Sequence, residues 1–262
     1  MNDSKLYDVI GAGYNSTRQA DPYLTERLYN LLSPKKDGNY IDIGCGTGNY
    51  TIALAEKELN FCGVEPSGNM LSLARSRNDK VRWLNGSAEN IPADDDSFDG
   101  GIATLTIHHW TDLRKAFAEI YRVLKQNAQL VIFTATPEQM LGYWLNHYFP
   151  KMLKDSMRQM PDFGKVNDAA TAAGFFYAGT ERYFIHDDLH DHFLYAGKSR
   201  PELYFDEAVR AGISSFSALS NALEVEEGLE QLRLDMAFNR FDGIRSKYDN
   251  ETGDYLFIIL QK

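Results

Sequence analysis

The sequence predicts an α/β fold: a doubly wound, mostly parallel sheet of seven strands that carries an inserted helical lid. Two observations lead to this prediction. Between residues 39 and 136, short apolar segments alternate with segments of helical periodicity, and the connections are brief. After residue 136 the alternation stops, and helical segments rich in Met, Trp, Tyr and Phe surround two further strands. The first region indicates right-handed crossovers and hence parallel strands.

The first region begins with helical periodicity over residues 1–30, clearest in L-T-E-R-L-Y-N-L-L, which S-P-K-K-D-G-N interrupts. A helix is then predicted over residues 50–59. Ser67 is expected to cap a second helix and Thr111 a third, the amphipathic T-D-L-R-K-A-F-A-E-I-Y-R-V-L-K. Strands are predicted at residues 40–44, 61–65, 81–84, 98–107 and 129–134.

The second region is predicted to be helical over residues 137–173 and 187–249, with strands at residues 175–185 and 255–260. The sequence shows no internal repeat and no low-complexity linker. We therefore expect the helical material to pack on the sheet and not to form a tethered module.

Composition restricts the kind of partner. The chain of 262 residues is 44% hydrophobic and 24% charged, with a net charge of -10 and a pI near 5.1. A groove that follows nucleic-acid phosphates needs clustered Lys and Arg, and the sequence has no such cluster. We expect a small-molecule substrate and no nucleic-acid partner.

The sequence also predicts a cytoplasmic setting without a membrane partner. No apolar run approaches the roughly 20 residues that span a bilayer, and M-N-D-S-K-L-Y-D lacks the features of a secretory signal. The two cysteines, Cys45 and Cys62, do not have the spacing of a metal site, and so few cysteines fit a reducing compartment. The oligomeric state is not indicated.

A glycine-rich loop follows the first predicted strand, where the sequence reads N-Y-I-D-I-G-C-G-T-G-N over residues 39–49. In a doubly wound sheet, ligands bind beyond the carboxyl ends of the strands. Gly44, Gly46 and Gly48 would let a ligand lie against bare backbone, and the next helix offers free N–H groups. Glu65 ends the second strand, where a carboxylate can accept two ribose hydroxyls.

Two ligand classes use such a loop. A nicotinamide dinucleotide needs G-x-G-x-x-G, whose third glycine would fall at Asn49. The glycines here instead follow G-x-G-x-G, after Asp42, and a buried aspartate suits a ligand that bears a cation, such as an amino-acid ammonium. A nicotinamide-dependent oxidoreductase therefore remains a disfavoured alternative.

Five ordered blocks resemble the class I S-adenosylmethionine-dependent methyltransferases: Y-I-D-I-G-C-G-T-G, G-V-E-P-S, G-S-A-E-N-I-P, S-F-D-G-G-I-A-T-L-T-I-H-H-W and I-Y-R-V-L-K. The resemblance covers residues 39–135 and is strongest to the small-molecule branch that includes enzymes of ubiquinone and menaquinone biosynthesis. It implies a Rossmann-like core, S-adenosyl-L-methionine as cofactor and S-adenosyl-L-homocysteine as product. The chain would then consist of a lid helix and cofactor-binding core (residues 1–136) and of helical substrate-lid insertions with the last two strands (residues 137–262).

The resemblance also implies a role for each matching residue. Backbone groups of residues 44–46 would contact the methionine part, Asp42 would orient its ammonium directly or through water, and Glu65 would hold the ribose hydroxyls. The adenine would lie beside Pro66, and the methyl group beside the end of the fourth strand. The full set implied to bind the cofactor is Tyr14, Arg18, Asp42, Gly44, Cys45, Gly46, Glu65, Pro66, Ser87, Ala88, Thr104 and Leu105.

Two of these positions lie outside the shared core. Tyr14 and Arg18, in Y-N-S-T-R, are similar to a lid segment of this branch and stand one helical turn apart, so they can share a face that closes over the site.

The resemblance implies two further roles within the core. Ser87 and Ala88 would face the amino edge of the adenine. Cys45 would contribute backbone only, without a redox role.

The expected reaction moves a methyl group to an O, N or C nucleophile of a small organic acceptor. His108 and His109 follow the fourth strand, where either can act as a base or simply pack under Trp110. A protein that binds the nucleoside without turnover is a further alternative. The identity of the acceptor is not indicated.

Three other features have an ordinary interpretation beside a functional one. His186, His190 and His192 lie among aspartates, but their spacing favours a solvated stretch over a metal site, so we expect no metal. Arg200 or Arg210 can pair with a substrate carboxylate or make a structural ion pair. Several aromatic segments can line an acceptor pocket or form core: residues 143–144, 148–149 and 175–177.

Overall fold

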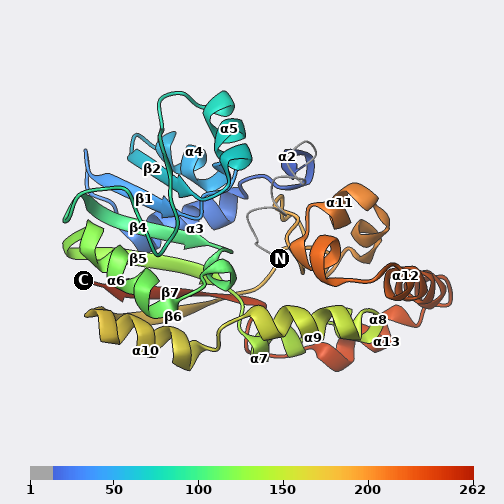
Figure 1. Ribbon diagram of the computed structural model, residues 1–262. Helices are drawn as coiled ribbons and strands as arrows, with labels where there is room; N and C mark the ends of the chain where they lie inside the picture. Colours follow the sequence, from blue (N-terminus) through green and yellow to red (C-terminus); the bar gives the residue numbers. More distant parts are fainter. Residues whose placement is uncertain (1–13) are drawn as a thin grey trace.

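The computed structural model describes residues 14–262, with side chains from Ser16 onward. Its centre is one sheet with the strand order β3-β2-β1-β4-β5-β7-β6 (Figure 1). The strands are β1 (Asn39–Ile43), β2 (Asn60–Glu65), β3 (Arg82–Asn85), β4 (Phe98–Thr104), β5 (Leu124–Thr134), β6 (Phe176–Tyr183) and β7 (Tyr255–Gln261).

The first five strands pair in parallel, and β7 pairs antiparallel with both β5 and β6. The predicted doubly wound, mostly parallel sheet of seven strands is confirmed. The chain leaves β1 towards β2 and β3 and then returns to β4 on the other side of β1. This reversal between β1 and β4 is where a doubly wound sheet opens a ligand crevice.

Helices cover both faces because side chains alternate along each strand. In β5, Val131 and Phe133 pack in the cluster that includes α3 (Pro22–Leu32) and α4 (Asn49–Ala55). Leu130 and Ile132 pack in the opposite cluster with α6 (Leu113–Val123) and α10 (Phe163–Ala173). In Figure 1, α10 runs below β6 and β7.

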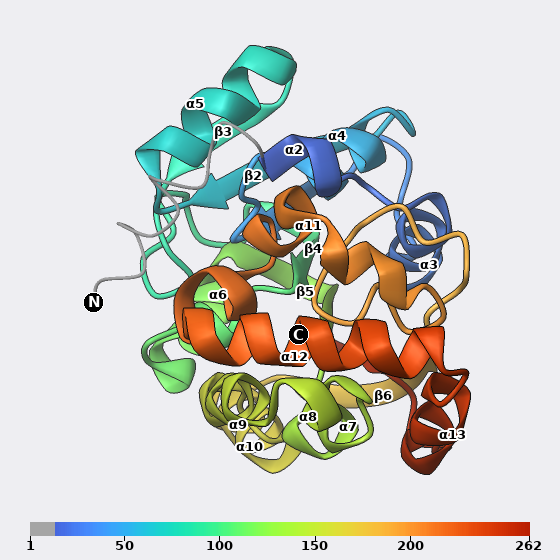
Figure 2. The same ribbon diagram turned by 90° about the vertical axis from the view of Figure 1, so that its right-hand side faces the viewer.

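A helical cap stands over one end of the sheet, to the right in Figure 1 and facing the viewer in Figure 2. It is drawn from two stretches of sequence, before β6 and between β6 and β7, and the short α2 (Tyr14–Thr17) packs against it at α11. Its elements are α7 (Pro137–Leu141), α8 (Leu145–Tyr148), α9 (Pro150–Gln159), the 3-10 helix η2 (Pro201–Phe205), α11 (Glu207–Ala211), the π-helix η3 (Ser215–Leu219), α12 (Ala222–Ala237), α13 (Phe241–Arg245) and the 3-10 helix η4 (Ser246–Tyr248).

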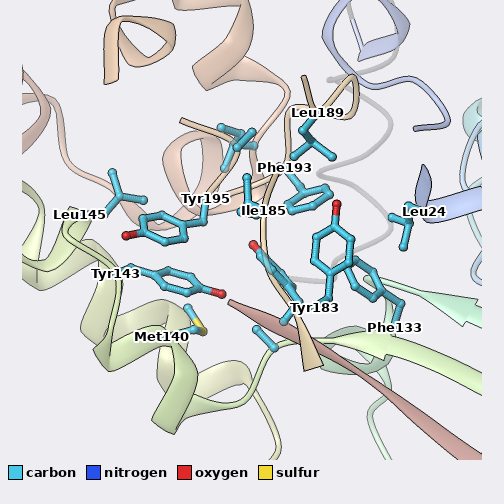
Figure 3. Packing of buried hydrophobic residues seen from close by; sticks show 14 of the residues in the cluster. Leu24, Phe133, Met140, Tyr143, Leu145, Tyr183, Ile185, Leu189, Phe193 and Tyr195 are labelled. Carbon is cyan, nitrogen blue, oxygen red and sulfur yellow. The ribbon is translucent and has the colours of Figure 1, made fainter. Parts of the chain in front are cut away.

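An aromatic cluster joins the cap to the sheet (Figure 3). The rings of Tyr143 and Tyr195 are stacked with centroids 4.0 Å apart, and Phe133 at the end of β5 packs edge-on against Tyr183 and Phe193. Aromatic pairs of this kind stabilise beyond the area they bury. The cap therefore shares its core with the sheet, although the division of the chain at residue 136 stays a prediction.

The helix predicted over residues 50–59 ends earlier, at Ala55, and the strand predicted over residues 175–185 is shorter, Phe176–Tyr183. Four further boundaries also differ from the sequence-based expectations. The cap of α6 is Asp112 and not Thr111: the Asp112 carboxylate accepts from the backbone N–H of Lys115, whereas Thr111 donates to Glu89. β4 ends at Thr104, before Leu105 at positive φ, and residues 107–109 form a 3-10 helix, η1. β5 starts earlier than expected, at Leu124.

The fourth difference is the stretch from residue 186 to residue 200, which is not helical. Its backbone is held by other parts of the chain: His190 N–H donates to Asp21, and His192 N–H donates to the carbonyl of Thr17. Such long-range partners compete with helical hydrogen bonds. Among the described residues, no helix combines the length and apolarity needed to cross a membrane.

Candidate functional site

One cavity of about 510 Å³ lies at the carboxyl ends of β1, β2 and β4, beneath the helical cap. This is the crevice that the strand order predicts. Its wall includes, from the predicted set, Arg18, Asp42, Gly44, Cys45, Gly46, Glu65, Pro66, Ser87, Ala88, Thr104, Leu105, His108 and His109. Tyr14 begins α2, but its side chain lies outside the described residues.

The three glycines of the loop have different neighbours. A Cβ atom at Gly44 would lie 2.0 Å from Thr106 Oγ1, and one at Gly48 would lie 2.3 Å from the Trp83 ring. A Cβ atom at Gly46 would meet no atom within 4 Å. Gly44 and Gly48 therefore leave room for Thr106 and Trp83, whereas the Cβ position of Gly46 is open. Gly44 and Gly46 line the cavity, and that a ligand lies against their backbone stays a prediction.

Glu65 is 8% exposed and is fixed at the end of β2 by the backbone. Its two carboxylate oxygens accept from Gly46 N–H at 3.0 Å and from Ser67 N–H at 2.9 Å. Burial raises its pKa, and the two backbone donors act in the opposite direction. Each oxygen retains a lone pair, so the carboxylate can accept two further hydrogen bonds from a ligand.

Asp42 is almost fully enclosed, and burial raises its pKa to about 7. Oδ2 accepts from Thr51 Oγ1 at 2.6 Å, whereas Oδ1 has no hydrogen-bond partner among the described residues. A buried acceptor without a partner is costly, and a ligand cation in the cavity would relieve that cost. This geometry fits the amino-acid ammonium expected from the sequence.

Arg18 reaches the cavity wall from the segment after α2 and pairs with Asp191, a residue 173 positions away. Arg18 Nε donates to Asp191 Oδ1 at 2.5 Å, and Tyr50 OH donates to Asp191 Oδ2 at 3.0 Å. The Asp191 side chain is 1% exposed. One carboxylate therefore connects the N-terminal segment, the helix after the glycine loop and the cap.

The last residue of β4 and the residue after it, Thr104 and Leu105, line the cavity. Thr104 Oγ1 is buried without a partner among the described residues. Leu105 has φ of 54°, a strained conformation for a branched side chain, and its N–H donates to the carbonyl of Phe133 at 2.8 Å. Strain of this kind persists where the surroundings impose it and is common at functional sites.

His108 and His109 lie side by side on the wall, with ring centroids 3.9 Å apart. Burial, reinforced by His109 and Arg18, holds the pKa of His108 well below its usual value, so its ring is neutral at pH 7. His108 Nδ1 is enclosed and has no partner among the described residues. A neutral imidazole can accept a hydrogen bond or a proton from a ligand.

Sequence reasoning missed most of the opposite wall, which the cap supplies. Of the aromatic candidates, Tyr143 lines the cavity, Trp144 and Phe149 are core, and Phe176 is exposed on β6. Only the general aromatic bias after residue 136 pointed to this wall. The missed lining residues include Tyr50, Glu89, Thr106, Met140, Ser156, Gln159, Met160, Asp191, Phe193, Leu194, Ile213, Ser214, Ser215 and Tyr255.

Other candidates lie elsewhere. Arg200 donates to the carbonyl of Leu189, Arg210 donates to the carbonyl of Tyr204, and neither lines the cavity. Within the described residues, no three His, Cys, Asp or Glu side chains are grouped as metal ligands.

Comparisons with known proteins agree with this geometry. A family model described as a methyltransferase domain matches residues 41–132. The crystal structure of a putative methyltransferase from an antibiotic biosynthesis pathway of Anabaena variabilis matches 94% of this chain and 99% of its own, with 34% identity and a TM-score of 0.82. The chain belongs to the class I S-adenosylmethionine-dependent methyltransferases. The resemblance stated from the five sequence blocks is thus confirmed.

Two curated relatives of this methyltransferase differ in how far they match. An uncharacterised methyltransferase of Mycobacterium tuberculosis is 30% identical over 134 residues, which are 51% of this chain and 55% of that protein. The chain therefore spans about half the length of that relative. A demethylmenaquinone methyltransferase of Listeria welshimeri is 28% identical over 214 residues, 70% of this chain and 89% of that protein.

Proposed function

We propose that this methyltransferase binds S-adenosyl-L-methionine in the cavity and moves its methyl group to an O, N or C nucleophile of a small organic acceptor. One observation carries the proposal. Asp42, with one oxygen that has no partner among the described residues, and the fixed Glu65 carboxylate both line the cavity in which Gly46 leaves the backbone open. The first suits an ammonium, and the second suits a pair of ribose hydroxyls.

The residues of the wall provide a position for each part of the cofactor. The methionine part would lie against residues 44–46, with its ammonium towards Asp42. The ribose would lie at Glu65, and the adenine between Pro66 and the segment of Ser87 and Ala88. Thr104 and Leu105 would lie beside the sulfonium, and Arg18 would close the site together with Tyr14. The chemistry of the cavity lining supports these roles except that of Tyr14, whose side chain lies outside the described residues.

When bound, the cofactor supplies a methyl group that its sulfonium has already activated. The task of this chain is to align the acceptor in line with that methyl and to exclude water. In this proposal the cap, whose residues line the cavity, serves both purposes. We propose that His108, neutral at pH 7, accepts a hydrogen bond or a proton from an acceptor that must lose one before attack; His109 is its neighbour.

We also infer a location and a class of partner, and composition and the two thiols support this inference. Cys45 and Cys62 are buried and free, which supports a reducing, cytoplasmic compartment. The net charge of -10 supports a small-molecule acceptor and not a nucleic acid.

Calorimetric titration of the purified protein with S-adenosyl-L-homocysteine, and in parallel with NADH, tests the cofactor. We expect S-adenosyl-L-homocysteine to bind and NADH not to bind. Glu65→Ala should weaken binding at least tenfold, because two hydroxyls lose their acceptor. Binding of NADH alone would favour the nicotinamide-dependent oxidoreductase and overturn the proposal.

Methyl transfer is tested separately, because binding alone does not exclude a protein without turnover. The protein is incubated with S-adenosyl-L-methionine carrying a tritiated methyl group and a panel of phenols, amines and carbon acids. Labelled product supports the transferase. Tight binding without label across the whole panel would favour the binding protein.

A further inference from the structure

The cap side of the cavity contains few charged groups. Of the described residues that line the cavity, Arg18 alone carries a fixed positive charge, and the buried carboxylate of Asp191 neutralises it. Three further carboxylates, from Asp42, Glu65 and Glu89, line the same cavity. Among the described residues, the cavity wall therefore offers an anionic acceptor no cation that is not already paired with a carboxylate.

The lining contributed by the cap and the last strand is mainly apolar. A ligand there would lie among thioether, aromatic and aliphatic side chains, which favour an apolar body. The buried residues are Met140, Tyr143, Phe193, Ile213 and Tyr255.

Two buried serines interrupt this apolar wall. Ser156 in α9 is 5% exposed, and Ser215 at the start of the π-helix η3 is 7% exposed. Ser156 Oγ donates to Ser215 Oγ at 2.8 Å, and both residues line the cavity. We call these two residues the serine pair.

The serine pair has unused hydrogen-bonding capacity. Two hydroxyls hold two O–H donors, and the bond between them uses only one. No other hydrogen bond of either side chain is made within residues 16–262. A buried donor of this kind usually finds a partner, and here the side open to it is the cavity. Short π-helical segments are also frequent at functional sites.

We propose that the acceptor is an uncharged, mainly apolar compound with a hydroxyl or carbonyl group that the serine pair recognises. The inference rests on the proposed function, because it assigns the cap side of the cavity to the methyl acceptor. Ser156 and Ser215 are then specificity-determining residues: they select acceptors by one hydrogen bond, while the apolar lining and the surrounding carboxylates disfavour carboxylated or phosphorylated analogues.

The test uses three probes that differ in one substituent: 1-naphthol, 1,5-dihydroxynaphthalene and 5-hydroxy-1-naphthoate. Each is titrated by calorimetry into protein saturated with S-adenosyl-L-homocysteine. We expect the dihydroxy compound to bind about tenfold more tightly than 1-naphthol, since one hydrogen bond is gained. The naphthoate should bind at least tenfold more weakly than 1-naphthol.

Variants of the serine pair decide its role. Ser156→Ala and Ser215→Ala should each remove most of the preference for the second hydroxyl, and Ser215→Cys, a weak donor of similar shape, should restore part of it. The matched control is Ser217→Ala in the same π-helix, because Ser217 is exposed, bonds to the carbonyl of Ile213 and does not line the cavity. The control should keep the full preference.

Several outcomes would overturn the inference. One is a naphthoate that binds as tightly as 1-naphthol, and another is a preference that survives in both alanine variants. A third is a lower melting temperature of the alanine variants together with an equal fall in affinity for all three probes. That result is expected if the serine pair is merely structural. Failure of all three probes to bind the saturated protein also counts against it. Failure of S-adenosyl-L-homocysteine itself to bind would instead overturn the proposed function.

Discussion

At the scale of single residues, Asp42 shows how a binding group can lower stability. Its carboxylate is enclosed, has one oxygen without a partner among the described residues, and has a pKa raised from 3.8 to about 7. Because the folded chain disfavours the ionised form, this residue favours folding most below the pKa of the unfolded aspartate. That contribution is lost as the pH rises through about 7. A ligand cation would reverse the penalty.

The first prediction follows from the direction in which Asp42 makes the stability of the free protein depend on pH. Asp42→Asn keeps the shape of the side chain but removes the titration. Without ligand, the variant should be more stable than the parent, and its advantage should be larger at pH 8 than at pH 4 by on the order of a few kcal/mol. Chemical denaturation at the two pH values measures this difference.

The same substitution should weaken ligand binding, although it stabilises the protein without ligand. Asp42→Asn should bind S-adenosyl-L-homocysteine about tenfold or more weakly at pH 8, since the ammonium loses its counter-charge. The parent should lose affinity as the pH falls through about 7, whereas the variant should not. A variant that gains no stability at pH 8 would contradict the assignment of an unpaired, ionised Asp42.

The second prediction compares alanine substitutions at two glycines of the loop, Gly48 and Gly46. Gly48→Ala places a methyl group 2.3 Å from the Trp83 ring at positive φ and should cost about 2 kcal/mol or more. Gly46→Ala meets open space and should cost only about 1 kcal/mol of backbone strain. Its main effect should be at least a tenfold loss of S-adenosyl-L-homocysteine affinity, measured by calorimetry beside the melting temperature. Unchanged affinity in Gly46→Ala would show that the ligand does not approach this backbone.

At the scale of elements, Asp191 joins three segments that are far apart in sequence. Its carboxylate binds Arg18 after α2 and Tyr50 in α4, and it lies in the non-helical stretch between β6 and η2. A buried carboxylate with a guanidinium and a phenol as donors is specific in geometry, although its formation costs desolvation. The cap is therefore positioned over the cavity by a polar contact as well as by aromatic packing.

The third prediction concerns this contact. Asp191→Ala leaves Arg18 partly buried without its counter-charge and should destabilise the chain by about 3 kcal/mol. A double-mutant cycle with Arg18→Ala should show strong coupling in chemical denaturation. The control is Glu230→Ala, which breaks the exposed pair with Arg233 and should leave the melting temperature unchanged. Additivity of the Asp191 and Arg18 variants would mean that the pair does not hold the cap.

At the scale of the whole molecule, the sheet and half of the cavity could be predicted from sequence, because both depend on local pattern. The order of apolar strands and helices predicts the doubly wound sheet, and Asp42 and Glu65 stand at strand ends that any such sheet brings together. The neighbours of the glycines could not be predicted in this way. Thr106 and Trp83 come from other segments, and only the packing shows that they occupy the space where side chains at Gly44 and Gly48 would lie.

The other half of the cavity depends on contacts between distant segments. Asp191 lies in a stretch whose histidines and aspartates suggested solvent or metal, and no local signal links it to Arg18. Ser156 and Ser215 meet only because α9 packs on η3. Composition marked the cap as aromatic, but it did not indicate which rings form core and which face the cavity.

The position of β7 has a consequence for synthesis of the chain on the ribosome. β7 lies between β5 and β6, yet it is translated more than a hundred residues after β5. At typical elongation rates this delay lasts roughly ten seconds. During that time the hydrogen-bonding edge of β5, which carries Val131, Ile132 and Phe133, has no neighbour, and β6 has no strand to pair with. A nascent chain that has passed residue 134 but not residue 255 therefore presents an open apolar edge, and an open edge of this kind is the state in which a strand of another chain can pair with it.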